Sequence, residues 1–346
     1  MKIFKPNHKP DTQGIISLDQ RKDPKKRFVV KADGGSTRKS TINDELHYLN
    51  DGYKAKVCIY RGCGGIGDIL MCTPLLQAIK ETYPDCHLTF AVDTKTANDT
   101  YYNILKNNPY IDEVISAHTV NRDRYHLFKD ISSSCLQYEN SGLPWINRID
   151  IFANACGFKL KNPKVYYKVE DQEREWAQAI ISKVTKGNSH KIVMLHTASF
   201  DVKRTWPIHK YIELIGYLNK NRSDIFYLVN DFQGLYPYWD KVKNTYNVSA
   251  YRIRELAALT EQVDCFVGPD SGPMHIAGAL EILGVTLFGS IPPQARINYY
   301  PSLEAITATG LACLGCGYHG CQFNIKCMTS LSPQMVGDRV LRIIDG

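Results

Sequence analysis

Short apolar runs alternate with helical stretches along the chain from about residue 55 onward. In the first half, strands are expected at 57–60, 88–92 and 113–116, and helices near 73–83 and 97–107. In the second half, strands are expected at 191–196, 225–229, 265–268 and 285–288, and helices near 208–221, 253–261 and 273–281. This alternation is typical of parallel sheets built from βαβ units. The 346 residues suffice for two such α/β domains, and a helix near 170–185 marks the boundary between them.

The basic character of the chain is concentrated at its start. The whole sequence carries a net charge of +7, of which residues 1–56 supply +6. We expect a basic extension over residues 1–54 that is partly ordered at best, because this segment is polar and has one short apolar run, at 27–30. Such an arm suits DNA, RNA or an anionic membrane surface, and a solvated tail without a partner is the alternative.

The sequence gives no indication of membrane insertion or secretion. It contains no run of about 18 to 20 apolar residues, and residues 1–9 lack the apolar core of a signal peptide. Most of the eleven cysteines stand singly in apolar segments, where a reduced thiol acts as a small hydrophobe. We therefore expect a cytoplasmic protein, with the inner face of the membrane as an alternative peripheral location.

A glycine-rich turn, RGCGGIGD at 61–68, follows the first expected strand. Gly62, Gly64 and Gly67 satisfy the dinucleotide pattern G-x-G-x-x-G, and Asp93 stands at the end of the second strand, where an acid would hold a ribose. These features indicate an NAD-dependent oxidoreductase as one alternative.

Asp68 argues against a dinucleotide in this turn. Its carboxylate follows the third glycine directly and would repel a docked pyrophosphate. Pro74 either begins the regular helix or interrupts one that started at Gly67. The same carboxylate suits a general base that takes a proton from a neutral hydroxyl. The structural alternative for Asp68 is an acid stabilised by the helix dipole.

A second strand-turn-helix motif, GPDSGPMHIAGAL, follows about 200 residues later. Asp270 or Ser271 can cap the helix, Pro273 suits its first position, and free N–H groups begin at Gly272. Such a helix start binds anions, and His275 can add a donor. The simpler alternative for His275 is a core histidine.

Together, the two turns resemble glycosyltransferase family 9, the heptosyltransferase-like glycosyltransferases. The main matches are GGIGD, Thr73-Pro74, Tyr83-Pro84 and GPDSGPMH. Further matches are NNPYIDEVI at 107–115, LHTAS at 195–199, RTWP at 204–207, and the cysteine-bearing tail through Met328 and Ser332-Pro333. The resemblance covers about residues 55–345.

The resemblance implies a GT-B architecture, in which two Rossmann-like doubly wound domains face a cleft. An acceptor domain would span 55–170 and a nucleotide-sugar domain 171–331, and a C-terminal helix in 332–346 would pack back on the N-terminal domain. Transfer would be inverting and metal-independent, and the sequence indeed contains no Asp-x-Asp motif.

Site residues are also implied by the resemblance. Asp68 would be the general base, on an acceptor-side turn formed by Gly64, Gly65 and Gly67. The donor-binding residues would be Thr197, Ser199, Lys203, Arg204, Tyr251, Asp270, Ser271, Gly272, Pro273, Met274 and His275. Tyr251 would stack on the donor base or belong to the core. No acid for the donor ribose is recognisable at 229–233, which leaves the base of the nucleotide open.

The remaining motif is C-x2-C-x4-C-x5-C, formed by Cys313, Cys316, Cys321 and Cys327. This spacing is compatible with tetrahedral zinc but lacks the second C-x2-C pair of a zinc ribbon. Similar clusters in the resembled family take no part in the chemistry, which favours a structural loop. We therefore expect no cofactor for catalysis, with structural zinc as an alternative.

The sequence thus predicts an inverting glycosyltransferase that moves a sugar from an ADP-heptose-like donor to a glycan such as the lipopolysaccharide core. One alternative keeps the chemistry but takes DNA or another anionic acceptor, guided by the basic arm. The oxidoreductase and a catalytically silent nucleotide-binding module are alternatives of other classes.

Overall fold

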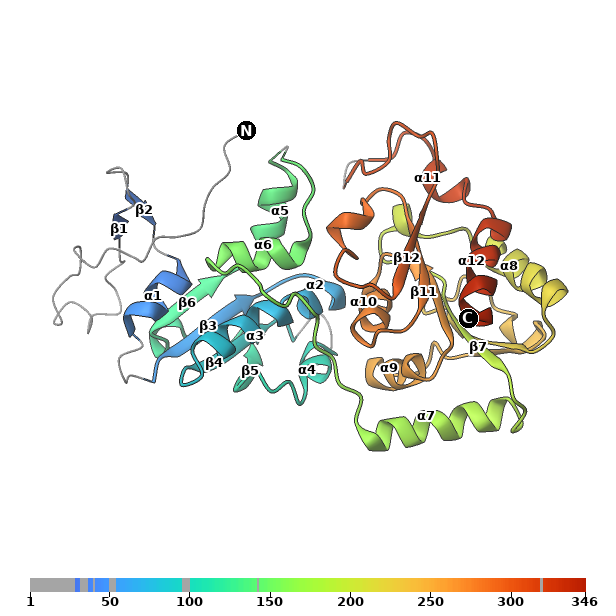
Figure 1. Cartoon of the computed structure of the whole chain (residues 1–346), viewed down its shortest axis with the longest axis horizontal. Helices are drawn as coiled ribbons and strands as arrows, with labels where there is room; N and C mark the ends of the chain where they lie inside the picture. The colour runs from blue at the N-terminus through green and yellow to red at the C-terminus, as the bar shows by residue number, and fades with distance from the viewer. Residues whose placement is uncertain are drawn as a thin grey trace.

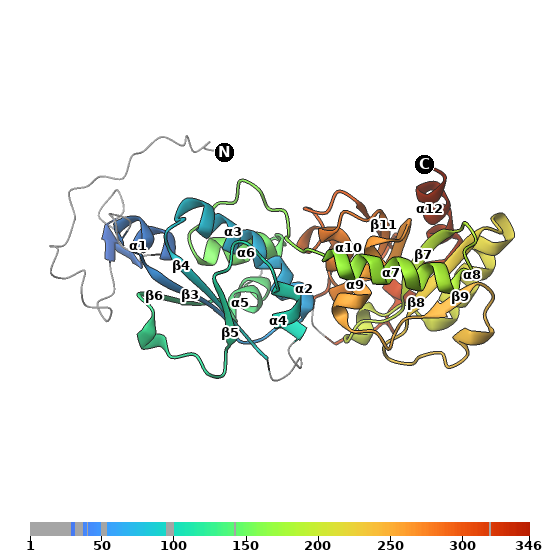
Figure 2. The same ribbon diagram turned by 90° about the horizontal axis from the view of Figure 1, so that it is seen from below.

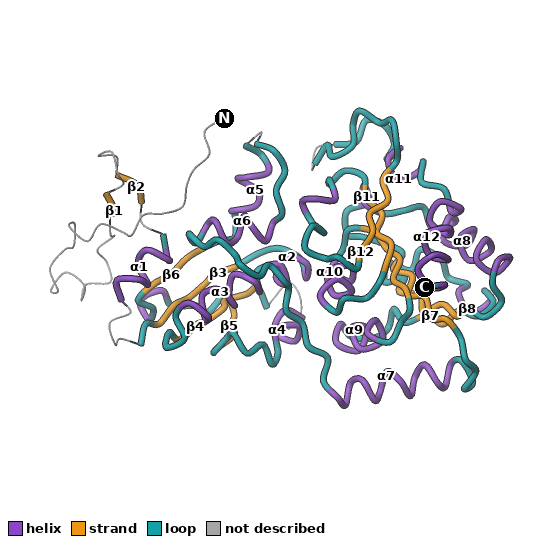
Figure 3. The backbone as a smooth tube through the Cα atoms, viewed as in Figure 1, coloured by secondary structure: helices purple, strands orange, loops and turns teal. Residues whose placement is uncertain are grey.

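The computed structural model describes residues 29–31, 37–39, 41–49, 54–94, 100–141, 143–317 and 320–346. Within these ranges the chain forms two lobes, each built on a parallel sheet, and a long helix joins them (Figure 1). Figure 3 shows the strands of the two parallel sheets in two separate groups. The expected α/β class is confirmed. Among the described residues, no helix combines the length and apolar character needed to cross a bilayer.

The first sheet has the strand order β5-β4-β3-β6, and all its strand pairs are parallel. Its strands are β3 (Lys56–Arg61), β4 (His87–Val92), β5 (Glu113–Ser116) and β6 (Leu127–Asp130). The helices of this lobe are α1 (Ile42–Leu49), α2 (Ile66–Met71), α3 (Thr73–Thr82), α4 (Thr100–Leu105), α5 (Ser134–Glu139) and α6 (Arg148–Ala155). A separate antiparallel pair is formed by β1 (Val29–Lys31) and β2 (Thr37–Lys39). The sequence pattern misses β6 because Leu127 and Phe128 are its only apolar residues.

Helix α1 corrects the expected extent of the N-terminal extension. Ile42 and Leu46 are buried in the core of the first lobe. The N–H of Asn43 donates to the carbonyl of Cys156 at 3.1 Å, and the Tyr83 hydroxyl donates to the Asn43 side chain at 2.8 Å. Two apolar residues one turn apart thus give α1 a buried face. Most of the expected basic arm, including residues 1–28, lies outside the described part of the chain.

The second sheet has the strand order β12-β11-β10-β7-β8-β9, and all its strand pairs are parallel. Its strands are β7 (Lys191–His196), β8 (Ile225–Asn230), β9 (Thr245–Asn247), β10 (Cys265–Pro269), β11 (Gly284–Phe288) and β12 (Leu303–Thr307). The helices from here on are α7 (Asp171–Val184), α8 (Ile208–Asn221), α9 (Ile253–Glu261), α10 (Gly272–Ala279), α11 (Lys326–Thr329) and α12 (Pro333–Asp345). Short 3-10 helices are η2 (Arg122–Arg124), η3 (Val202–Arg204), η4 (Trp239–Lys241) and η5 (Pro293–Ala295).

The break between α2 and α3 decides between the two alternatives for Pro74. Helix α2 begins at Ile66, beside Gly67, and ends at Met71, and α3 then begins at Thr73. Pro74 therefore lies in the first turn of a second helix, where its missing N–H costs no hydrogen bond.

The strand orders place the glycine-rich turn and the second motif at topological switch points. In the first sheet, β3 lies between β4 and β6, so the chain leaves it toward opposite sides. In the second sheet, β7 lies between β8 and β10 in the same way. Ligands of open parallel sheets bind beyond the carboxyl ends of the strands at such points. The turns after β3, β7 and β10 are therefore the expected binding positions.

Helix α12 packs on the second lobe, which corrects its expected return to the N-terminal domain. Val336 and Val340 are buried together with Leu214 of α8. The Tyr217 hydroxyl of α8 also donates to Asp338 at 2.5 Å. The apolar stripe of α12 thus finds its partner in the neighbouring helix of the same lobe.

Candidate active site

The amino-terminal ends of α2 and α10 meet where the two lobes touch, as Figure 1 and Figure 2 show from two sides. A Cβ added at Gly67 would overlap the imidazole ring of His275, and one added at Gly272 would lie 2.9 Å from Cβ of Ile66. The two glycines therefore permit a close approach of the helices. Each helix start carries partial positive charge and free N–H groups, so this seam attracts anions.

Asp68 lies in the first turn of α2, at the seam. Its Oδ2 accepts the N–H of Gly65 at 2.9 Å, and its Oδ1 forms a close ion pair with Arg148 and lies 3.7 Å from Arg61. The preceding turn needs a glycine at Gly64, whose φ is 111°. Asp68 thus both caps α2 and partners two arginines, and its side chain is 13% exposed.

The surroundings of Asp68 determine its charge state. Burial alone would raise the pKa of this carboxyl, but Arg148, Arg61 and the Gly65 N–H outweigh burial and hold the pKa well below its usual range. Asp68 is therefore ionised at neutral pH. A general base needs this protonation state, although a low pKa gives proton transfer little driving force.

A series of ion pairs runs from this turn into the second lobe. Arg148 binds Glu139 bidentately, with Nε to Oε1 at 2.8 Å and Nη2 to Oε2 at 2.7 Å. Oε1 of Glu139 also accepts Nη1 of Arg296 at 3.3 Å, and Nε of Arg296 lies 3.6 Å from Oδ2 of Asp270. Nη1 of Arg204 donates to the same Asp270 oxygen at 3.0 Å. We call this series the interdomain charge chain: Arg61, Asp68, Arg148, Glu139, Arg296, Asp270 and Arg204.

Four members of the interdomain charge chain were not predicted from the sequence: Arg61, Glu139, Arg148 and Arg296. Glu139 and Arg148 stand in a segment without a regular apolar pattern, and Arg296 follows η5 in the connection between β11 and β12. Charged residues in such segments are usually solvated, so nothing marks these three as site residues. Arg61 carries a signal, because it adjoins the glycine-rich turn.

The predicted donor turn places Asp270 and His275 together. Burial alone would raise the pKa of Asp270, but Arg296 and Arg204 outweigh it and lower the pKa overall. Nδ1 of His275 lies 3.0 Å from the Tyr300 hydroxyl, and its Nε2 lies 3.9 Å from Asp270. Burial lowers the pKa of His275 to about 4, so the neutral ring offers one N–H at pH 7.

The rest of the turn forms the start of α10. Ser271 is the N-cap residue, and Gly272 and Pro273 occupy the first turn, where they are partly exposed. The side chain of Met274 is fully buried in the apolar core, so only its backbone belongs to the helix start. Of these four residues, Gly272 and Met274 bring first-turn N–H groups to the seam.

The loop after β7 carries the other predicted phosphate-binding residues. The Thr197 hydroxyl donates to Asp231 at 2.9 Å, and Ser199 is buried. Nζ of Lys203 donates to the carbonyl of Gly317 at 3.4 Å. Arg204, already part of the charge chain, is therefore the side chain of this loop that directly contacts the donor turn.

Asp231, at the end of β8, is engaged by its own loop. Its carboxylate accepts hydrogen bonds from the Thr197 hydroxyl, the N–H groups of Leu235 and Tyr236, and the indole N–H of Trp239, at 2.9 to 3.1 Å. A carboxylate has about four acceptor sites, so no site is left for a ribose hydroxyl.

Aromatic side chains that follow strands of the second sheet lie in two different places. Tyr251 packs edge-on against Trp176 of α7, with ring centroids 5.1 Å apart. Phe232 stacks on buried His196 at 5.7 Å, and Phe200, which is 92% exposed, lies 5.1 Å from Phe232. Phe200 and Phe232 follow β7 and β8 at their carboxyl ends, and no sequence motif marks either of them.

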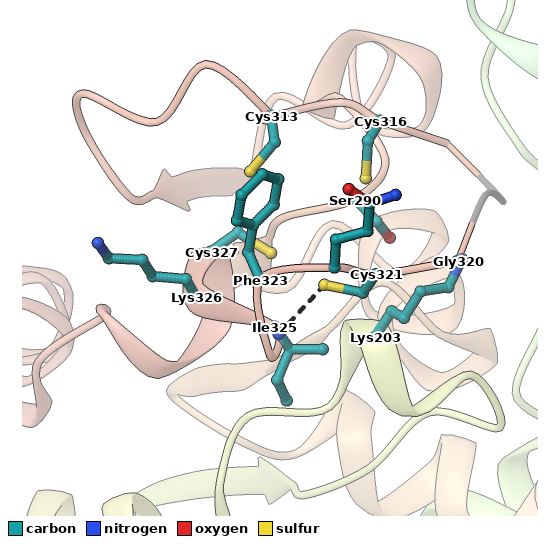
Figure 4. A pocket seen from close by; sticks show the side chains of 11 residues that line it. Lys203, Ser290, Cys313, Cys316, Gly320, Cys321, Phe323, Ile325, Lys326 and Cys327 are labelled. Atoms are coloured by element: carbon teal, nitrogen blue, oxygen red, sulfur yellow. Dashed lines mark hydrogen bonds between the residues drawn. The ribbon is translucent and has the colours of Figure 1, made fainter.

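The four cysteines of the C-terminal motif line one cavity of about 90 Å³ (Figure 4). Sγ of Cys321 accepts the N–H of Ile325 at 3.2 Å. Burial raises the pKa of the Cys327 thiol, and the three other thiols raise it further. In the described part of the chain, no three or more His, Cys, Asp or Glu side chains are arranged to hold a metal ion. Lys203 lines the same cavity.

Comparisons with known proteins give the family of the chain and its relatives. The family model for glycosyltransferase family 9 (heptosyltransferase) matches residues 142–325, just over half of the chain. Lipopolysaccharide heptosyltransferase 1 of Campylobacter coli is 22% identical over 315 residues, covering 74% of this chain and 90% of the relative.

Solved structures show the same fold. A family 9 glycosyltransferase from Veillonella parvula has a TM-score of 0.65 at 15% identity, covering 86% of this chain and 98% of that one. ADP-heptose LPS heptosyltransferase II of Escherichia coli has a TM-score of 0.62 at 15% identity, covering 83% and 98%.

Two parallel-sheet lobes whose strand-turn-helix motifs meet at a shared seam form a GT-B fold. The chain belongs to glycosyltransferase family 9. The oxidoreductase alternative is therefore wrong. Asp93, its candidate ribose acid, is instead paired with Nε2 of His118 at 2.7 Å.

Proposed function

We propose that the protein transfers a heptose-type sugar from an ADP-linked donor to a hydroxyl of a lipopolysaccharide-core glycan, with inversion and without a catalytic metal ion. The Campylobacter coli relative is a lipopolysaccharide heptosyltransferase, and the Escherichia coli structure is an ADP-heptose LPS heptosyltransferase. The observation that carries the proposal is the meeting of Asp68, on α2, with the anion-binding start of α10. Residues 55–170 would then bind the acceptor and residues 171–331 the donor.

The proposed step is a single displacement. The acceptor oxygen attacks the anomeric carbon and forms the new glycosidic bond, and its proton passes to a carboxylate oxygen of Asp68. The bond from the anomeric carbon to the phosphate oxygen breaks, and its electron pair leaves with the diphosphate. Because Arg148 holds Asp68 in the structure, the acceptor hydroxyl must take over part of that contact.

The leaving diphosphate would be stabilised from the second lobe. The N–H groups at the start of α10, from Gly272 onward, point their partial positive charge at the seam. The guanidinium group of Arg204 and the neutral ring of His275 add donors beside them. Lys203 is the second cation that we propose for the diphosphate.

Other donor contacts follow from the same proposal. Ser199 and Thr197 border the phosphate loop, although the Thr197 hydroxyl must first give up Asp231 to bind a ligand. Tyr251 stays a candidate for the donor base through its exposed side. Because its own loop still holds Asp231 through Leu235, Tyr236 and Trp239, the ribose would be bound without an acid from the end of β8.

A thermal-shift screen with ADP-heptose, ADP-glucose, UDP-glucose, GDP-mannose and NAD tests the donor class. A ligand at 100 times its Kd stabilises a protein by about 2.7 kcal/mol, which corresponds to a rise in Tm of about 4 °C for a chain of this length. We expect ADP-heptose to give the largest rise. A larger rise with a UDP- or GDP-sugar would contradict the ADP donor. If a nucleotide-sugar binds but a separate assay detects no sugar transfer, the protein would be a catalytically silent nucleotide-binding module.

The basic N-terminal arm is proposed to bring this catalytic body to an anionic surface, either a membrane or a nucleic acid. Residues 1–56 supply +6 of the net +7. Because α1 belongs to the core, a truncation should remove residues 1–40 only. Equal, salt-sensitive binding of DNA and anionic vesicles by the full and truncated chains would eliminate the arm's role.

Structural zinc in the cysteine loop also stays a proposal. Four thiols line one cavity, but the described side chains do not form a ligand set, so the loop would have to close around an ion. Less than one equivalent of zinc in the purified protein would eliminate this proposal.

A further inference from the structure

We infer that Glu139 is a positioning residue for the transfer reaction: it restrains Arg148, the arginine that holds Asp68, and links it to Arg296 of the second lobe. The inference rests on the proposed role of Asp68 as the base. Nothing in the sequence motifs points to Glu139, so the inference depends on the contacts of its side chain.

The position of Glu139 is unfavourable without these partners. It is the last residue of α5, where the carbonyl end of a helix repels a negative charge. Its side chain is only 1% exposed, so the carboxylate is also removed from water. A buried carboxylate at such a place is costly unless cations pair with it, and Arg148 and Arg296 do so.

The contacts of Arg148 show how Glu139 acts on the base. Glu139 takes Nε and Nη2 of Arg148 in a bidentate pair, which leaves Nη1 to contact Asp68. The two carboxylates therefore share one guanidinium group, and Glu139 fixes its orientation. Without the negative charge of Glu139, the whole charge of Arg148 would act on Asp68 and make it a weaker base.

Glu139 also contacts the second lobe, through Arg296. Its partner Arg296 comes from the connection between β11 and β12, and Nε of Arg296 faces Asp270 of the donor turn at 3.6 Å. Beside this contact, the amide of Asn147 donates to the carbonyl of Gln294 at 3.3 Å. The orientation of Arg148 therefore depends, through Glu139, on a residue of the second lobe.

A double-mutant cycle tests the inference with four proteins: wild type, Glu139→Gln, Arg148→Gln and the double variant. ADP binding is measured by calorimetry, and transfer by ADP release from ADP-heptose with lipopolysaccharide core as acceptor. We expect Glu139→Gln to lower kcat about tenfold while the Kd for ADP stays within about twofold of wild type. In the Arg148→Gln background the same change should alter kcat less than twofold, because the arginine through which Glu139 acts is missing.

Two further variants separate positioning from folding. Glu139→Asp keeps the charge and should recover part of the lost kcat. Glu261→Gln, which breaks a bidentate pair between α9 and Arg174 of α7, should leave kcat unchanged. Normal kcat in Glu139→Gln, or equal losses in both Arg148 backgrounds, would overturn the inference.

The experiment distinguishes a wrong proposal for the donor from a wrong inference about Glu139. If the wild type neither binds ADP nor releases it, the proposed donor is wrong. Tm values of the same four proteins still report whether Glu139 and Arg148 are coupled, and additive Tm losses would then overturn the inference.

Discussion

Burial keeps two histidines of the second lobe, His196 and His275, neutral at physiological pH. For both, burial is the largest cause and lowers the pKa to about 4 from an ordinary 6.5. The folded protein therefore binds fewer protons than the unfolded chain between these pH values. The free energy of unfolding is therefore highest, as far as these histidines are concerned, above about pH 6.5. It decreases as the pH falls toward 4, because the unfolded chain then binds protons that the folded protein does not.

This titration gives a prediction at the residue scale. Tm should fall between pH 6.5 and 4, since each pKa unit corresponds to about 1.4 kcal/mol. His196→Phe, which preserves a ring against Phe232, should make the fall shallower. Scanning calorimetry at closely spaced pH values checks this, and an identical pH dependence in wild type and variant would exclude His196 as a source.

The contact between α2 and α10 gives a prediction at the scale of elements. Gly67→Ala places a methyl group where the ring of His275 lies, so the two helix starts can no longer approach as closely. We expect transfer to fall at least tenfold, because Asp68 and the donor turn move apart by a fraction of an ångström or more. ADP affinity should change less than transfer, since His275 is the proposed donor contact that the new methyl group meets.

Gly216→Ala is the control for this prediction. Gly216 lies in α8, away from the seam, and a Cβ there meets no atom within 4 Å. Steady-state kinetics of both variants measures the difference. Equal activity of Gly67→Ala and Gly216→Ala would show that the close contact of the helices is not needed for transfer.

The elements that could be predicted from sequence are those with a strong local pattern. Strands β3, β4, β7, β8, β10 and β11 are buried apolar runs. Both ends of each strand lie within one residue of the expected position. Strands β6 and β9 are short and mixed in polarity, so no periodicity identifies them. The packing side of α12 depends on a neighbouring helix distant in sequence, which no local pattern encodes.

The candidate site shows the same contrast between residues in local motifs and residues joined by long-range contacts. Asp68 and the turn at 270–275 could be proposed because short motifs with a physical purpose carry them. Glu139, Arg148 and Arg296 could not, because their importance arises from ion pairs between residues up to 157 positions apart. Asp231 is the opposite case. Its position directly after β8 suits a ligand-binding residue, but its carboxylate accepts hydrogen bonds from the loop that follows it.

At the scale of the whole molecule, the two lobes would contribute different halves of the proposed reaction. The first carries an ionised carboxylate on α2, the second the start of α10 that we propose for the diphosphate, and the interdomain charge chain connects them across the seam. Four arginines and three carboxylates form this chain within the described residues. This excess of one positive charge suits a diphosphate that enters from the second lobe.

The most direct test of the account is Asp68→Asn, assayed for sugar transfer from ADP-heptose to lipopolysaccharide core and for ADP binding. Asparagine keeps an oxygen for the Gly65 N–H but cannot accept the acceptor's proton. We predict a loss of at least a hundredfold in kcat with an ADP Kd within about threefold of wild type. Transfer at the wild-type rate would contradict the role of Asp68 as the base.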